Sequence, residues 1–421
     1  MSPKSRGRPA GRGRPQRKRH GPVRELRLSD RVLRDAPTIA GQVDVLEAER
    51  WASGWLGTAW VQAGMGEREP EKTLCLEVVD RACTRPSPSG YAAVAALRRV
   101  APAGEEGMLD ETLAILAATQ PGPSWLGAPG FTPVRAFRAT DVWDSERVLF
   151  IEYDTTDPHA TTHTLMAQIL EPGGTMVTRL GILRPGAAQH WDDLREPDEV
   201  PMPVVEQPVE AVLAELAAAM RQTDMYWPRP DDEDYVELRA LAWARCRRYL
   251  PDWPDAPDLP DEQRQELLDA FLADQYPDRA AAAVRELADL FIDYGDGYLT
   301  RGVLAWSPAW VQLFLTDWLP RKAFLDDAQR DALAETLRRW LRFALHRRHV
   351  DPQWIEPVVA AVDEHLPEYE AAIDDETSWG PAKQIAAELA ARGVDLTDKT
   401  AVDAVISELN ATRLAQRLID G

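Results

Sequence analysis

The chain has 421 residues, of which 45% are hydrophobic and 28% are charged, and its formal net charge is −21 at pH 7. This apolar content is enough to bury a core on a chain of this length, which excludes global disorder. No stretch approaches the roughly 18 uninterrupted apolar residues of a transmembrane helix. Three cysteines are too few and too widely spaced for a disulfide framework or a zinc site. We therefore expect a cytoplasmic protein with reduced cysteines, no bound cofactor and no membrane partner.

The charge is distributed unevenly along the chain. Residues 1–22, the basic arm, carry eight basic side chains and no acidic one, and residues 23–421 hold 40 basic and 69 acidic side chains, a net charge of −29. Such asymmetry is typical of a tail that contacts nucleic acid, an acidic partner or its own body. We expect residues 1–29 to form a disordered tail, because the arm mixes arginine, glycine and proline without an apolar period.

The next predicted domain, residues 30–225, begins with helices. Apolar residues recur at helical spacing, and Trp51 and Trp55 lie on the first stripe, so we expect both tryptophans in the core. The predicted helices of this domain are 40–63, 71–84, 90–100, 104–118 and, after the strands, 209–222, although the stretch 74–79 is also compatible with a short strand.

Between these helices the hydrophobic period changes from 3.6 to 2. Runs rich in Val, Ile, Leu, Phe and Thr predict four strands near 134–142, 147–153, 162–171 and 175–184. Because parallel strands need crossovers of a dozen or more residues, the short connections favour an antiparallel meander at about 132–184. The segment 196–208 contains four prolines and is interpreted as a linker.

The acidic run 231–234 follows a Trp-Pro-Arg-Pro break and marks the predicted start of a helical domain, residues 226–421. Ser307 and Asp351 each precede a proline, and Asp326 is followed three residues later by Gln329, so all three positions predict helix N-termini. The stretch 293–298 contains two glycines and is expected to be a turn between helices. The predicted fold class is thus α+β and mainly helical: a small antiparallel meander within an N-terminal α+β domain, followed by an irregular helical bundle.

The basic arm contains Arg-Gly-Arg-Pro twice, and this sequence resembles the core of the AT-hook, a short DNA-binding peptide. The resemblance implies that the arginines lie in the narrow minor groove of A/T-rich DNA, where negative potential is concentrated and glycine permits close approach. The minor groove distinguishes A·T from G·C pairs but little more, so the implied specificity is loose. The implied DNA-binding residues are Arg6, Gly7, Arg8, Pro9, Arg12, Gly13, Arg14, Pro15, Arg17, Lys18 and Arg19.

One pair of histidines suggests different chemistry. His159 and His163 lie four residues apart, near Asp154 and Asp157, which is compatible with a metal-dependent, hydrolase-like enzyme. The segment is predicted to be a loop that enters a strand, so a polar hairpin loop also explains it. We identify no catalytic residue and no metal ligand.

Over residues 40–365 the body resembles a group of actinobacterial proteins that have no assigned function, through stretches such as DVLEAERWASGWLGTAW and DYGDGYLTRGVLAWSPAWVQLFLTDWLPRK. This resemblance implies no activity. The leading hypothesis is a non-enzymatic, DNA-associated accessory or adaptor protein, whose basic arm contacts the DNA minor groove and whose acidic body binds an unidentified protein partner. The alternatives are the hydrolase-like enzyme and an acidic protein-interaction scaffold in which the arm has no role.

Overall fold

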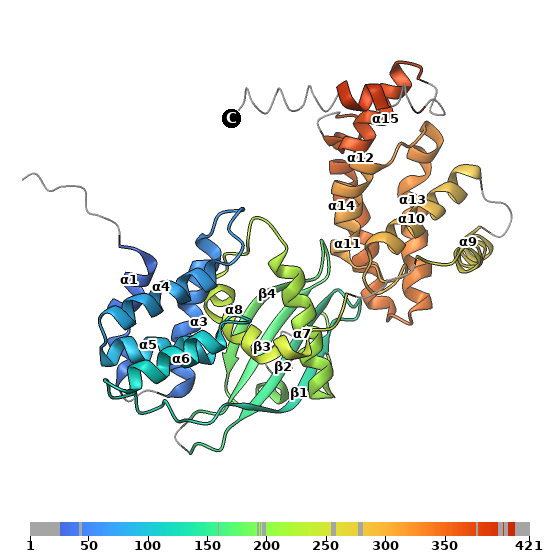
Figure 1. Ribbon diagram of the computed structural model, residues 1–421. Coiled ribbons are helices and arrows are strands. Elements are labelled where there is room, and N and C mark those ends of the chain that lie inside the picture. Colours follow the sequence, from blue (N-terminus) through green and yellow to red (C-terminus); the bar gives the residue numbers. More distant parts are fainter. Residues whose placement is uncertain are drawn as a thin grey trace, which may run out of the picture.

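The computed structural model describes residues 26–41, 44–158, 160–191, 193, 195, 199–253, 258–276, 281–375, 378–394, 399 and 403–408. It confirms an α+β, mainly helical fold, in which an antiparallel sheet lies between the N-terminal helices and a C-terminal helical region (Figure 1). Within these residues no helix combines the length and apolarity needed to cross a membrane.

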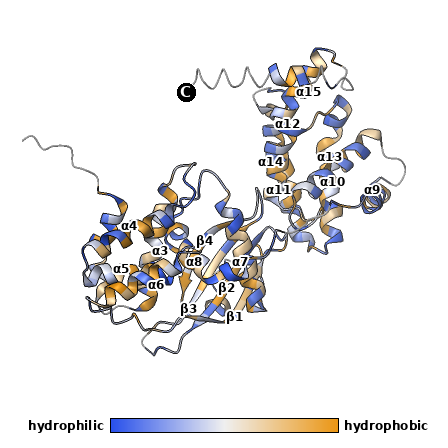
Figure 2. Cartoon of the chain, viewed as in Figure 1, coloured by the Kyte–Doolittle hydropathy of each residue, from blue (hydrophilic) through white to orange (hydrophobic). Residues whose placement is uncertain are grey.

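The N-terminal helices pack around α5, whose residues 90–97 are all buried. Figure 2 shows apolar and polar residues interspersed along these helices, as expected for amphipathic helices that cover a common core. Each helix predicted here is confirmed to within a few residues at its ends, and a further short pair precedes them. The six helices are α1 (Leu28–Asp35), α2 (Pro37–Ala40), α3 (Val45–Gln62), α4 (Pro70–Thr84), α5 (Pro88–Arg99) and α6 (Glu106–Ala117).

The predicted antiparallel meander is confirmed, with strand order β4-β3-β2-β1-β5. A fifth strand, β5, lies in the proline-rich segment expected to be a linker, and it pairs antiparallel with β1 at the sheet edge. Proline is tolerated beside an edge strand, so the prolines that suggested a linker do not prevent this pairing. The strands are β1 (Thr132–Thr140), β2 (Glu146–Asp154), β3 (His163–Leu170), β4 (Met176–Leu183) and β5 (Val204–Gln207).

Both faces of the sheet are covered. Alternate side chains such as Leu149 and Ile151 join the N-terminal core beside α7 (Val209–Asp224) and α8 (Glu233–Cys246), whereas Phe150 faces a smaller cluster around Met202. This alternation follows from the period-2 pattern of a strand buried on two sides.

Helix α8 joins the N-terminal helices to the sheet. It follows the acidic run that marked the predicted domain boundary, yet Tyr235 and Leu241 belong to the same core as α3 and the sheet. The second large core contains C-terminal residues from Leu268 onward, together with Trp143 from the β1–β2 turn. The division of the chain at residue 225 stays a prediction.

The C-terminal region is helical, and the predicted N-caps at Ser307, Asp326 and Asp351 are confirmed, including the capping box with Gln329. The predicted turn at 293–298 is wrong, because this stretch is the last part of α10. Here Gly295 permits close packing: a Cβ at this position would lie 2.8 Å from the Cα of Val303. The helices are α9 (Asp261–Gln275), α10 (Ala282–Tyr298), α11 (Pro308–Leu313), a π-helical turn η4 (Phe314–Trp318), α12 (Leu319–Lys322), α13 (Asp327–Arg347), α14 (Pro352–Ile373) and α15 (Pro381–Ala391).

Candidate functional site

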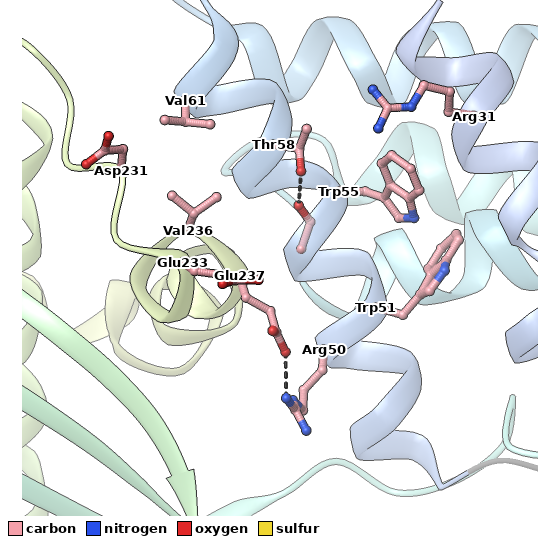
Figure 3. Close-up of a pocket in the computed structure, with 11 residues that line it drawn as sticks. Arg31, Arg50, Trp51, Trp55, Thr58, Val61, Asp231, Glu233, Val236 and Glu237 are labelled. Carbon is pink, nitrogen blue, oxygen red and sulfur yellow. Dashed lines mark hydrogen bonds and ion pairs between the residues drawn. The ribbon is translucent and has the colours of Figure 1, made fainter. Parts of the chain in front are cut away.

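A surface groove crosses α3 between α1 on one side and α8 on the other, and its volume is about 550 Å³ (Figure 3). Small and medium-sized residues of α3, Gly54 and Thr58 among them, form its floor. One wall contains two tryptophans and an arginine, and the other contains carboxylates. We call this feature the tryptophan groove; the residues that define it are Arg31, Trp51, Gly54, Trp55, Thr58, Asp231, Glu233 and Glu237.

The aromatic wall consists of Trp51 and Trp55, which lie one helical turn apart on α3. Their ring centroids are 6.4 Å apart with an interplanar angle of 71°, an edge-to-face arrangement. Both side chains are half-buried. The indole N–H of Trp51 donates a hydrogen bond of 2.6 Å to the carboxylate of Asp35, which holds this ring against α1.

A guanidinium group already lies against this wall. The Cζ atom of Arg31 is 5.4 Å from the centroid of the Trp55 ring, within the distance at which a cation is attracted by an indole face. Figure 3 shows the Arg31 side chain next to Trp55 at the α1 side of the groove. The aromatic wall is therefore chemically suited to arginine.

The opposite wall is acidic. Glu237 of α8 pairs with Arg50 of α3 across 2.6 Å, and Asp232 caps α8 by accepting a hydrogen bond from the Tyr235 amide. In the described part of the chain Asp231 and Glu233 have neither an ion-pair partner nor a side-chain hydrogen bond, and both are exposed. This wall thus offers two uncompensated carboxylates opposite an aromatic surface.

The shape of the groove follows from close packing of α3 on α8. A Cβ at Gly57 would lie 1.8 Å from the carbonyl oxygen of Val236, so only glycine permits this approach. Nearby, the Ser53 hydroxyl accepts a hydrogen bond of 3.0 Å from the Leu241 amide. These two contacts fix the point at which α3 and α8 cross beside the groove.

The third helix, α1, is held in place by polar contacts with α4. The Ser29 hydroxyl donates to the Glu77 carboxylate at 2.5 Å, and Arg81 pairs with Asp30 at 2.8 Å. Arg31 is therefore presented to the groove by a helix that is tied to α4 through Ser29 and Asp30 and to α3 through Asp35.

The tryptophan groove was missed from sequence, where Trp51 and Trp55 were expected in the core. The buried face of α3 instead carries Ala48, Ala52 and Leu56, and the two tryptophans pack at its margin. The sequence contains one signal of this arrangement: the small residues form a separate stripe at helical spacing, which leaves the tryptophans on an adjacent face.

The implied DNA-binding residues of the basic arm, from Arg6 to Arg19, lie outside the described residues, and so does His159. His163 is buried, with its ring stacked on Tyr153 at 5.4 Å between centroids and in edge contact with Phe131 at 4.6 Å. Burial, and then the positive charge of Arg245, lower the pKa of His163 to about 4. His163 thus packs as a neutral ring in the core beside the sheet.

Metal chemistry receives no support from the described residues, since no three His, Cys, Asp or Glu side chains among them are placed to hold a metal ion. Comparisons of the chain with protein-family models, with curated proteins and with solved structures find no match. The tryptophan groove must therefore be interpreted from its own chemistry.

Proposed function

We propose that this protein is a non-enzymatic adaptor that binds A/T-rich DNA through its basic arm and a second protein through the tryptophan groove. The observation that carries the second part is that Trp51 and Trp55 line the same groove as the uncompensated carboxylates of Asp231 and Glu233. Large half-buried aromatic rings supply binding energy at low entropic cost, and carboxylates select the charge of the partner.

The partner segment that fits this groove contains arginine and proline. A guanidinium can pack against an indole, as that of Arg31 lies 5.4 Å from the Trp55 centroid, and a second arginine of the same segment can pair with a carboxylate of the opposite wall. Proline-rich segments are pre-organised as extended helices and dock in aromatic-lined grooves. An arginine- and proline-containing segment therefore satisfies both walls at once.

DNA binding is tested by fluorescence anisotropy with an A/T-rich and a G/C-rich duplex at several salt concentrations. If all eight basic groups of the arm meet phosphates, the logarithm of the binding constant falls with the logarithm of salt concentration at a slope of about −7. The control is a full-length neutral-arm variant, in which glutamine replaces all eight basic residues of the arm: Lys4, Arg6, Arg8, Arg12, Arg14, Arg17, Lys18 and Arg19. Equal binding by this variant and the wild type would overturn the DNA-binding part of the proposal.

Groove binding is tested with a labelled ten-residue peptide of alternating arginine and proline. Trp55→Ala is expected to weaken peptide binding by about 2- to 30-fold, the range of one cation–π contact. Trp253→Ala is the matched control, because Trp253 is an exposed tryptophan that does not line the groove and also lies beneath an arginine, Arg221. Equal losses in the two variants, or no peptide binding by the wild type, would contradict the proposal.

A further inference from the structure

We infer that the tryptophan groove binds the chain's own basic arm, so that the groove and DNA compete for the same arginines. The inference rests on the proposed function, since it names the basic arm as an occupant of the tryptophan groove. An arm that is bound in the groove is not available to bind DNA. Three observations carry it: where the arm joins the body, the complementary charge of the two parts, and the length of the arm.

The arm joins the body beside the groove. The described chain begins at Leu26, and α1 starts at Leu28, so Arg31 on the groove wall lies within the first turns of ordered structure. Because Ser29 and Asp30 tie α1 to α4, the point of departure is held fixed next to the groove.

The arm also has the chemistry that the groove selects. It carries eight basic groups, no acidic group and two copies of Arg-Gly-Arg-Pro, whereas Asp231 and Glu233 are uncompensated carboxylates. One arm arginine can pack against the aromatic wall, as Arg31 lies near Trp55, and a second arm arginine can pair with the acidic wall.

The arm is long enough to return to the groove. The ten residues 16–25 separate the second Arg-Gly-Arg-Pro motif from Leu26, and they extend up to about 35 Å. Short tethers hold a ligand at an effective concentration in the millimolar range. At about 1 mM, an interaction with a dissociation constant near 100 μM would be formed in roughly nine of ten molecules.

This competition has a measurable consequence. With the arm bound to the groove in about nine of ten molecules, the apparent affinity for A/T-rich DNA falls about tenfold. A partner segment that occupies the groove releases the arm and raises DNA affinity by the same factor, since coupling between two binding events is reciprocal.

The contact itself is tested without DNA. A labelled peptide of residues 1–25 is titrated with the full-length neutral-arm variant, whose groove lacks its own competitor. Saturable binding is expected, and both Trp55→Ala and the double replacement Asp231→Lys with Glu233→Lys are expected to weaken it at least fivefold. The matched control for the charge change is Asp261→Lys with Glu262→Lys, two exposed carboxylates in the first turn of α9. No binding, or equal effects of the two charge reversals, would overturn the inference.

The consequence is tested on DNA with an intact arm. Trp55→Ala and the Asp231/Glu233 reversal are each expected to bind the A/T-rich duplex about four to ten times more tightly than the wild type, with the α9 reversal as the control for bulk charge. Unchanged DNA affinity in the groove variants would overturn self-competition while leaving the proposed adaptor function intact. Failure of the isolated 1–25 peptide to bind DNA would instead overturn the DNA-binding part of the proposed function, and the peptide titration above would still decide whether the arm occupies the groove.

Discussion

The indole N–H of Trp143 donates a hydrogen bond of 3.0 Å to the backbone carbonyl of Trp354, although the two residues are more than 200 positions apart. Their rings meet edge to face, 6.4 Å between centroids, and Arg348 donates to the Trp143 carbonyl at 3.0 Å. The β1–β2 turn is thereby part of the C-terminal core, and Asp144 in this turn has a φ of 60° and pairs with Arg348. This contact joins the sheet to the C-terminal helices.

Substitutions of Trp143 should destabilise the protein, and the loss should be larger when the whole ring is removed than when only the hydrogen-bond donor is removed. Trp143→Ala removes a buried ring and is expected to lower the free energy of unfolding by about 3–5 kcal/mol. Trp143→Phe keeps most of the ring but loses the donor, for a loss of about 1–2 kcal/mol. Urea denaturation followed by circular dichroism measures both. Similar stabilities for Trp143→Ala and for Trp253→Ala, whose ring is exposed, would contradict this role.

A buried carboxylate forms a second link between the two halves. Glu171, at the end of β3, pairs with buried Arg147 and accepts hydrogen bonds from the hydroxyls of Thr175 at 2.7 Å and Thr300 at 2.6 Å. Burial alone would raise the pKa of Glu171, but the charge of Arg147 and the two hydroxyl donors outweigh it and lower this pKa below its ordinary value.

Glu171→Gln removes one of the two carboxylates that pair with Arg147 and leaves Glu215, 2.6 Å from its Nε, so we expect a loss of about 1–3 kcal/mol in unfolding free energy near pH 7. Because the folded-state pKa is lowered, the stabilisation by Glu171 is present above the unfolded-state pKa and is lost as the pH falls through the folded-state value. Adding Arg147→Met to the glutamine variant should recover part of the loss, as measured in a double-mutant cycle of urea midpoints. Strictly additive losses would rule out this pairing.

His163 should make stability sensitive to pH in a different window. Its folded-state pKa of about 4 lies below the ordinary value of 6.5, so the unfolded chain takes up the proton first as the pH falls. The stabilisation is present above pH 6.5 and is lost between pH 6.5 and about 4, by about 2 kcal/mol between pH 7 and 4.5. His163→Phe keeps an aromatic ring against Tyr153 and removes the proton site. Over this pH range the unfolding free energy of His163→Phe should fall by about 2 kcal/mol less than that of the wild type. Parallel curves of unfolding free energy against pH for the two proteins would show that His163 is not the group responsible.

Two glycines of α3 provide a matched pair that tests how the tryptophan groove is shaped. Gly57→Ala places a methyl group against the Val236 carbonyl, at a distance of 1.8 Å before relaxation, and is expected to destabilise the fold by several kcal/mol. At Gly54 the nearest atom would be the Cγ of Glu237 at 3.7 Å, an ordinary contact. Gly54→Ala should therefore be neutral or stabilising by up to about 1 kcal/mol, because alanine favours a helix interior. Thermal unfolding distinguishes the two, and a stable Gly57→Ala would contradict the backbone contact between α3 and α8.

The sequence by itself determined the features that depend on short-range physics. The strands of the meander and the helices of the first half appear where hydrophobic periodicity and turn residues predict them, and the caps at Ser307 and Asp326 need only neighbouring side chains and amides. The helical conformation of residues 293–298 was not predicted, because Gly295 serves close packing against Val303 and not a turn. The edge strand β5 was not predicted from the sequence, because its four residues lie beside prolines and form a strand only through their hydrogen bonds to β1.

Only the tertiary structure decided where the candidate site lies. Residues of α1, α3 and α8 that are nearly 200 positions apart in the chain meet in one groove, and no local pattern encodes such a meeting. The close approach at Gly57 and Val236 brings the acidic run after the Trp-Pro-Arg-Pro break opposite Trp51 and Trp55. From the sequence, the acidic run was interpreted as a domain boundary and the two tryptophans as part of a core stripe. In the folded protein they form the two walls of the tryptophan groove, because long-range contacts determine which face of an amphipathic helix stays exposed.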